Sequence, residues 1–429
     1  MFSRPELSAG TDRRVGHDCH KHIGYMAAVG RFGMSSDEGA SVVVPAITAA
    51  SSVICLRSLG RRGINTIAAA ESADIPALRS RYCDEAVKLP SPRTDLLGYK
   101  NALLALARRP DVRTITPLRE VDSYVLSAYR EEFAEHIATP WPTLDVLRDA
   151  HDRIRLADAA EAAGVAIPET RLLDTVEDWD RERIVKARYA LLVNEYVPSL
   201  PETASAKGAL TEHIDPGVEP DVEGITARMG HVPITQEFVP GEEFAVWALC
   251  DDGEPVTICQ RRRVRGFKYT GGASVCRKTM YDPDLDRVAR ALLAELDWHG
   301  LASVQFIANE TTGEYELMEI NPRFWASVSC AVQAGLDFPY EYYRFAGGES
   351  FDGDPTYERG VATHLLRGEG AYLHSVLTER SPYVEVPSFP AEAWAVARSC
   401  LAQPHFDYLS LDDPRPFVRD LRNEVSKLL

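Results

Sequence analysis

The stretch 301–327 constrains the fold more than any other part of the sequence, because it predicts two adjacent strands with polar side chains on one face. Residues 301–308 are apolar and rich in β-forming side chains, 309–314 form a polar connection with a glycine, and 315–321 predict the returning strand of a hairpin. Strand alternation then places Tyr315, Leu317, Glu319 and Asn321 on the same face. Pro322, which has no N–H to donate to a neighbouring strand, ends the second strand.

The polar face of this hairpin carries ligands that suit a magnesium ion. Glu319 and Asn321 lie about 7 Å apart along the strand by rise alone, and Gln305 is on the partner strand. Carboxylate and amide oxygens are hard donors of the kind that Mg²⁺ prefers, with water and phosphate completing its octahedron. Arg323 follows with a permanent positive charge that can hold a phosphate oxygen. An ordinary hairpin with a solvated acidic face accounts for the same pattern, so the residues alone leave both interpretations open.

The segment ELMEINPRFWAS resembles the signature of the ATP-grasp superfamily, in which an E-x-N-P-R strand follows a strand that carries the first metal ligand. The segment SVQF is similar to the version in carbamoyl-phosphate synthase large subunits, where that ligand is Gln. The continuation FWASVSCAVQAGLDFPY resembles a group of predicted ATP-dependent carboxylate–amine ligases. The resemblance implies that Gln305, Glu319 and Asn321 hold Mg²⁺ or Mn²⁺, and that Arg323 is a catalytic residue that contacts phosphate.

Two earlier segments resemble the phosphate-binding parts of the same superfamily. VKAR is similar to its V-K-P-R strand, which implies that Lys186 binds the ATP phosphates, and HDRIRLADAAEAAGVAIPET implies the same for Arg153. A snorkelling lysine and an exposed helix arginine paired with a nearby aspartate explain the two residues equally simply. The sequence also departs from the family. Ala187 replaces the usual proline, and no glycine-rich flap lies between Lys186 and Lys207, because 199–224 predicts a long loop.

The segment ITQEFVPGEEFAVWALCDDGE predicts a second hairpin, with strands at 234–239 and 243–250 around a Pro-Gly turn. As a bare hairpin it carries little information. Its resemblance to the nucleotide hinge of ATP-grasp proteins implies that Glu237, Phe238 and Val239 line the adenine of ATP and that Glu243 binds the ribose hydroxyls.

The segment QRRRVRGFKYTGGAS concentrates positive charge in an acidic protein. Arginine side chains bind phosphate or carboxylate, and paired glycines let backbone N–H groups approach an anion. The candidate substrate anion site therefore comprises Arg261, Arg263, Arg265, Gly271 and Gly272. A charged strand that balances nearby acids is an equally good explanation, and no interleaved aromatic residues support nucleic-acid binding.

The first half of the chain predicts a parallel, doubly wound α/β sheet, because the strands at 41–46 and 64–70 flank a helix at 49–62 and this alternation continues to 117. No G-x-G-x-x-G follows the first strand, which argues against a dinucleotide site. The predicted organisation is a disordered extension at 1–39, a Rossmann-like pre-ATP-grasp domain at 40–140, a two-lobed α+β ATP-grasp module at 141–348 and a C-terminal appendage at 349–429. In that appendage no chemistry stands above packing. Met26 and Met34 are alternative starts to Met1.

Composition limits the partners and the compartment. The net charge of −17 disfavours nucleic acid and anionic membranes as partners. The eight cysteines lack C-x-x-C and zinc spacings, and no segment has the order of a signal peptide or the length of a membrane span, so a cytoplasmic protein is expected. A homodimer is left open.

The sequence therefore predicts an ATP-dependent ligase that joins a carboxylate to an amine through an acyl phosphate and releases ADP and phosphate. The substrates would be a small acid and a small amine, with Mg²⁺ or Mn²⁺ required. Two alternatives remain: an enzyme that activates bicarbonate for carboxylation or carbamoylation, and a nucleotide-binding regulator without catalytic activity.

Overall fold

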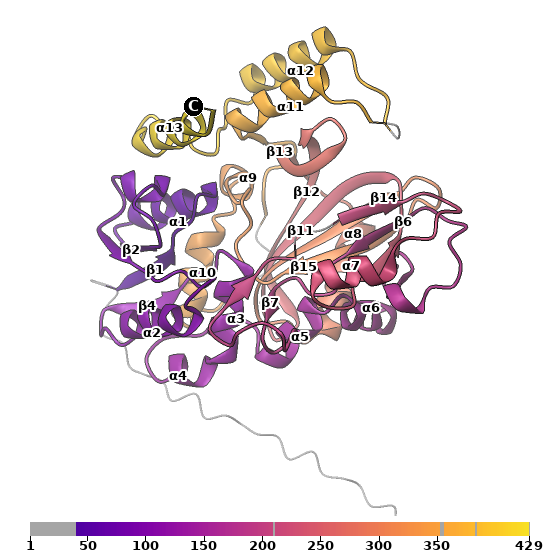
Figure 1. Cartoon of the computed structure of the whole chain (residues 1–429). Helices are drawn as coiled ribbons and strands as arrows, with labels where there is room; N and C mark the ends of the chain where they lie inside the picture. Colours follow the sequence, from indigo (N-terminus) through magenta and orange to yellow (C-terminus); the bar gives the residue numbers. More distant parts are fainter. Residues whose placement is uncertain (1–39, 209–210, 352–355, 382–383, 429) are drawn as a thin grey trace, which may run out of the picture. The chain divides into compact units, whose positions relative to one another are not determined.

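A computed structural model of the chain describes residues 40–208, 211–351, 356–381 and 384–428. The predicted extension 1–39 lies outside the described residues. The predicted fold class is confirmed over the described part of the chain: a parallel α/β sheet comes first, and antiparallel sheets with helices follow it (Figure 1).

A parallel sheet of four strands in the order β3-β2-β1-β4 opens the described chain. Its strands are β1 (Ser41–Pro45), β2 (Asn65–Ala70), β3 (Glu85–Lys88) and β4 (Val112–Ile115). Val42 and Val44 pack in one core with α1 (Ala50–Gly60), and Val43 packs in another with α2 (Leu96–Ala107). Burial on both faces explains the nearly continuous apolar run of β1. The 3-10 helix η1 (Pro76–Arg79) and the helices α3 (Glu120–Ala128) and α4 (Arg130–Ala134) complete this region.

A small antiparallel sheet has the strand order β5-β10-β6-β9. Its strands are β5 (Thr170–Leu172), β6 (Arg183–Lys186), β9 (Thr211–Ile214) and β10 (Ile234–Glu237). The same part of the chain contains η2 (Leu173–Thr175), α7 (Val222–Met229) and a separate two-stranded sheet of β7 (Leu192–Val193) and β8 (Ser205–Ala206). The prediction of a long loop over 199–224 is therefore wrong, because β8, β9 and the start of α7 lie within it. These strands are too short to give a periodic signal in the sequence.

Residues 144–162 form two helices, α5 (Leu144–His151) and α6 (Arg153–Ala162). Asp152 separates them, because its backbone is extended and its carboxylate caps the start of α6. The same carboxylate accepts hydrogen bonds from the Arg188 guanidinium, and the Arg153 N–H donates to the Arg188 carbonyl. The break therefore fixes Arg153 beside the end of β6.

A larger antiparallel sheet has six strands in the order β15-β14-β11-β12-β13-β16. The strands are β11 (Gly241–Asp251), β12 (Glu254–Lys268), β13 (Gly271–Met280), β14 (Gly300–Asn309), β15 (Tyr315–Asn321) and β16 (Ala362–His364). Val246, Val304 and Phe306 share a core with α6 and with α8 (Pro283–Glu295). The opposite face carries Glu243 and Gln305 and lines a cavity. The hairpin predicted over 301–321 is confirmed as β14 and β15.

The hairpin predicted over 234–250 is wrong in its pairing. Strand β10 pairs with β5 and β6 in the small sheet, whereas β11 pairs with β12 and β14 in the large sheet. The chain therefore crosses from one sheet to the other between Glu237 and Gly241 instead of turning back on itself. Local sequence could not show this, because the pairing of β10 and β11 depends on strands from other parts of the chain.

A β-bulge changes which side chains of β15 face the cavity. Gln305 pairs with Glu319, but Phe306 pairs with Leu317, so that Met318 has no partner in the register. Leu317 is consequently buried in the core, whereas Met318 and Glu319 both line the cavity. The prediction that Leu317 shares a face with Glu319 is wrong, because the extra residue shifts the alternation by one position.

The C-terminal part of the described chain contacts the large antiparallel sheet and helix α1. After α9 (Ser329–Gln333) and α10 (Phe338–Ala346), β16 pairs with β13, and α11 (Leu366–Thr378), α12 (Phe389–Ala402) and α13 (Arg415–Leu428) follow. Asp413 forms a buried ion pair of 3.0 Å with Arg57 of α1. Among the described residues, no helix combines the length and the apolar character that crossing a membrane requires.

Candidate active site

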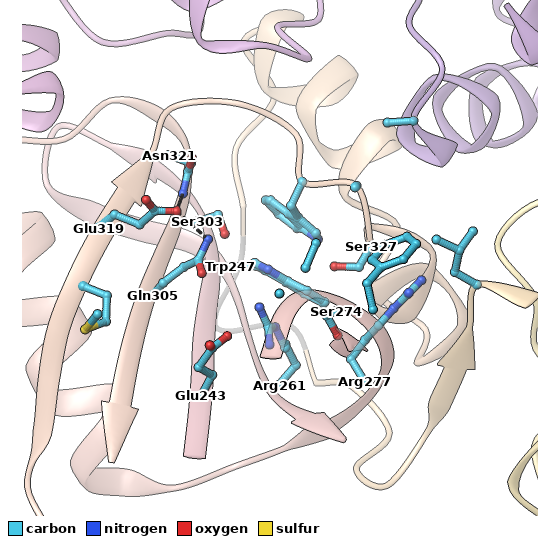
Figure 2. A pocket seen from close by; sticks show the side chains of 18 of the residues that line it. Glu243, Trp247, Arg261, Ser274, Arg277, Ser303, Gln305, Glu319, Asn321 and Ser327 are labelled. Carbon is cyan, nitrogen blue, oxygen red and sulfur yellow. Dashed lines mark hydrogen bonds between the residues drawn. The ribbon is translucent and has the colours of Figure 1, made fainter. Parts of the chain in front are cut away.

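Two adjoining cavities lie over the polar ends of β14 and β15. The larger has a volume of about 680 Å³ (Figure 2), and the smaller has a volume of about 450 Å³. Five residues that the sequence analysis singled out line both cavities: Arg153, Lys186, Glu319, Asn321 and Arg323. Two predicted metal ligands and the predicted phosphate-binding residues therefore lie where the two cavities meet, and the third ligand, Gln305, lines the larger cavity.

Positive charge dominates the wall of the larger cavity, although the protein carries a net charge of −17. The cationic lining residues are Arg153, Lys186, Arg261, Arg277, Arg323 and Arg367, and the acidic ones are Glu243, Glu319 and Asp407. Charge of one sign on the wall of a cavity raises the local concentration of the opposite ion. The cavity is therefore suited to an anionic ligand.

Glu319 is the centre of the predicted metal site. Its Oε1 accepts hydrogen bonds from the amides of Gln305 at 2.9 Å and Asn321 at 3.0 Å. Its Oε2 lies 3.4 Å from the guanidinium of Arg153. The structure thus brings the three predicted ligands together. Their hard oxygen atoms fit Mg²⁺ once the two amide oxygens, instead of the nitrogens, face the ion.

Arg323 is oriented by two side-chain acceptors. Its guanidinium donates to Asn321 Oδ1 at 2.9 Å and to Glu120 Oε1 at 2.6 Å. The other oxygen of Glu120 lies 3.3 Å from Nε2 of His151, a fully buried residue. Burial alone would raise the pKa of Glu120, but the charges and hydrogen bonds of Arg323 and His151 lower it to about 2. Glu120 is therefore ionised at neutral pH and holds Arg323 at the cavity.

Lys186 and Arg153 lie together at the end of β6. The Lys186 ammonium donates to Gln236 Oε1 at 2.8 Å, and among the described residues it forms no ion pair with a carboxylate. Burial and the neighbouring Arg153 lower the pKa of Lys186 to about 8, against the opposing charges of Glu319 and Glu243. A ligand with negative charge would relieve this desolvated cation.

Described residues between β6 and β9 line the smaller cavity. Lys207, Gly208 and Thr211 line that cavity together with Lys186. A Cβ added to Gly208 would lie 2.3 Å from the Cβ of Ala187, so this position accepts only glycine without a shift of the chain. Gly208 therefore packs closely on Ala187, the residue that follows Lys186.

The predicted nucleotide residues divide into two groups. Glu243 lines the larger cavity, where it forms an ion pair of 2.6 Å with Arg263. Glu237, Phe238 and Val239 are not among the residues that line either cavity, and Glu237 is 3.4 Å from Arg181. The adenine and ribose roles stay predictions.

The candidate anion site is only partly assembled at the cavity. Arg261 and Gly272 line it, but Arg263, Arg265 and Gly271 do not. The register of β12 against β13 shifts between Arg263 and Arg265. Arg265 instead donates two hydrogen bonds of 2.8 Å to the buried carboxylate of Glu369. Of the charged run, Arg261 is thus the member that reaches the cavity.

Sequence reasoning missed several residues of the site. Arg277 of β13 lines the cavity and is bonded to Asp407, and Arg367 and Trp247 line it as well. Arg367 and Asp407 belong to the region for which the sequence predicted no chemistry beyond packing. These positions are separated along the chain and share no motif, so only the fold brings them together.

Comparison with known proteins gives one family match. Residues 232–364, less than a third of the 429 residues, match the family described as ATP-grasp in the biosynthetic pathway with Ter operon. The search of curated proteins found no match to this sequence.

Solved structures share the fold over most of the chain. N5-carboxyaminoimidazole synthetase from Staphylococcus aureus has a TM-score of 0.56 at 13% identity, covering 76% of this chain and 81% of that one. Biotin carboxylase from Campylobacter jejuni has a TM-score of 0.56 at 15% identity, covering 75% and 74%. The biotin carboxylase domain of 2-oxoglutarate carboxylase from Hydrogenobacter thermophilus, in complex with MgADP, ADP and bicarbonate, has a TM-score of 0.57 at 16% identity, covering 75% and 72%.

Proposed function

We propose that this chain, whose fold is that of the ATP-grasp superfamily, is an ATP-dependent ligase that joins a carboxylate to an amine. The observation that carries the proposal is the cluster of Gln305, Glu319 and Asn321, which is flanked by Lys186 and Arg323 where the two cavities meet. Hard oxygen ligands beside cations are the arrangement that a metal–phosphate complex needs. The superfamily of the similar structures supports the same class of reaction.

Different side chains would bind the metal ion and the phosphates. Gln305, Glu319 and Asn321 would hold Mg²⁺, and Lys186 and Arg153 would hold the phosphates. ATP, when bound, supplies the phosphoryl group that activates a carboxylate, and Mg²⁺ neutralises part of the phosphate charge. Arg323 would neutralise the charge that develops on the transferring group, because Glu120 fixes its direction before the reaction.

The proposed reaction has two steps, phosphoryl transfer and attack by the amine. A substrate carboxylate oxygen attacks the γ-phosphorus, the bond to the β–γ bridging oxygen breaks, and ADP leaves. The amine then attacks the acyl carbon, loses a proton to water, and releases phosphate that contains the oxygen of the original carboxylate. The protein supplies positioning and charge and forms no covalent bond itself.

Bicarbonate activation is the second candidate. The similar structures include a carboxyaminoimidazole synthetase and biotin carboxylases, one of them in complex with bicarbonate. A regulator that binds nucleotide without turnover is the third, and it is disfavoured by the presence of the complete set of predicted metal ligands beside Arg323.

A reducing, cytoplasmic setting is supported by the described cysteines, which are all free.

The test is ATP turnover with three sets of additions: bicarbonate, a panel of carboxylic acids with hydroxylamine as a general amine, and neither. Formation of ADP and hydroxamate only with an acid supports the ligase. Turnover that depends on bicarbonate alone supports the second candidate, and nucleotide binding without turnover supports the third. Glu319→Gln, which removes the ligand charge but keeps the shape, is the inactive control.

A further inference from the structure

Four buried side chains on the wall of the larger cavity have N–H groups without an acceptor among the described residues. They are Arg261 (Nε and Nη1), Arg277 (Nε), Trp247 (Nε1) and Trp325 (Nε1). Their exposed fractions are 6%, 1%, 0% and 4% in that order. Arginine and the indole of tryptophan only donate hydrogen bonds. Buried polar groups are normally satisfied, so the group that completes this wall must be rich in acceptor atoms.

Arg261 also lacks a counter-charge. Arg263 forms an ion pair with Glu243, and Arg277 forms one with Asp407, but no described carboxylate forms an ion pair with Arg261. Burial lowers the pKa of Arg261 to about 10, which leaves it charged at neutral pH. A buried cation without a partner is unfavourable in the free protein. The missing acceptor is therefore an anion.

Sheet register relates Arg261 to the predicted metal site. Arg261 is paired with Ala245, Ala245 with Gln305, and Gln305 with Glu319, so the four form one row across β12, β11, β14 and β15. Paired residues point to the same face of a sheet, and two strand spacings separate Arg261 from Gln305 by about 10 Å between backbones. The residue between them is alanine, so no long side chain of this row divides the cavity.

Figure 2 shows the two ends of the row that runs from Arg261 to Glu319. Glu319, Asn321 and Gln305 gather on one side of the cavity, and Arg261 lies away from Glu319, between Glu243 and Arg277. The cavity therefore leaves room for an acid beside Glu319 to extend toward Arg261.

We propose that the acid substrate carries a second acidic group, and that Arg261, with the unpartnered donors of Arg277, Trp247 and Trp325, binds it. The substrate class is a small diacid, activated at one end and held at the other. This inference rests on the proposed ligase function, because that function places the reacting carboxylate beside the metal ligands.

The test compares diacids with monoacids of equal chain length. Succinate, glutarate and 3-phosphonopropionate are the diacids, butyrate and valerate are the monoacids, and hydroxylamine replaces the amine. The wild type should form hydroxamate from at least one diacid with kcat/KM at least tenfold above its matched monoacid. Arg261→Met should lower that kcat/KM at least a hundredfold and leave the KM for ATP unchanged.

Arg262→Met is the matched control. Arg262 is the next residue of β12, it is exposed, and its ion pair with Glu242 is long at 3.9 Å. The control loses the same charge and should keep the diacid activity. Wild-type activity that is equal for diacids and monoacids, or unaffected by Arg261→Met, overturns the diacid inference and leaves the ligase standing. No hydroxamate from any acid overturns the ligase, and the inference with it.

A second measurement needs no turnover. Because Arg261 is a buried cation without a counter-charge, Arg261→Met should raise the melting temperature of the free protein, and Arg262→Met should not. Succinate or glutarate should raise the melting temperature of the wild type but not of Arg261→Met. A lower melting temperature for Arg261→Met would contradict the unpaired state of this cation.

Discussion

Replacing Glu120 by glutamine tests the contact that orients Arg323. The pKa of Glu120 is lowered from 4.5 to about 2 because Arg323 and His151 outweigh the effect of burial. That difference corresponds to about 3 kcal/mol of stability at neutral pH. The Glu120 side chain is only 15% exposed, so water screens little of its interaction with Arg323. Glu120→Gln keeps the shape of the side chain, and the free energy of unfolding at pH 7 should fall by about 3 kcal/mol.

The pH dependence gives the sign of the effect. The pKa of Glu120 is lower in the folded protein than in the unfolded chain, so its contribution is complete above pH 4.5 and disappears as the pH falls through about 2. At pH 3 the difference between wild type and Glu120→Gln should therefore shrink to about 1 kcal/mol.

Urea unfolding followed by circular dichroism at pH 7 and pH 3 measures both values. Glu135→Gln is the control, because Glu135 is 76% exposed. The turnover of Glu120→Gln should also fall, since Arg323 loses one of the acceptors that orient it. A loss at pH 7 no larger than that of Glu135→Gln would refute the role given to this carboxylate.

Two further predictions concern nucleotide binding. The pKa of Lys186 is about 8, so about half of the Lys186 side chains are neutral at pH 8 in the free protein, and binding of MgADP should take up about half a proton. Calorimetry in buffers of different ionisation enthalpy should show this proton uptake for the wild type and not for Lys186→Met. A binding enthalpy that is independent of the buffer would contradict the prediction. Glu243→Ala should raise the KM for ATP by roughly tenfold to a hundredfold through loss of a charged hydrogen bond to the ribose, with little effect on 2′,3′-dideoxy-ATP. Equal losses for both nucleotides would leave Glu243 with only its ion pair to Arg263.

The sequence predicted those parts of the site that lie within one short segment. Glu319, Asn321 and Arg323 follow each other on β15 and just beyond it, and Gln305 is on the neighbouring strand of the same hairpin. Pairing between strands adjacent in the chain is a local property, so the ligand cluster could be expected before the fold was known. The elements β1, α1 and β2 were predictable for the same reason, because each has a strong apolar pattern of its own.

The errors come from properties that depend on distant parts of the chain. The bulge at Met318 depends on how β15 fits β14. Arg323 is paired with Glu120, which lies 203 residues away along the chain, and Arg277 is paired with Asp407, 130 residues away. Pairing of charges over such separations leaves no local signal. For this reason the sequence singled out a run of arginines, and only the structure separates Arg261 from the members that are already paired.

The fate of the carboxylate oxygen tests the proposed reaction most directly. With an ¹⁸O-labelled acid that supports turnover, attack at the γ-phosphorus must yield ADP and inorganic phosphate that contains one labelled oxygen. Mass spectrometry of phosphate and nucleotide should detect this label for the wild type and not for Glu319→Gln. AMP and pyrophosphate as products, or unlabelled phosphate beside ADP, would contradict the acyl-phosphate route.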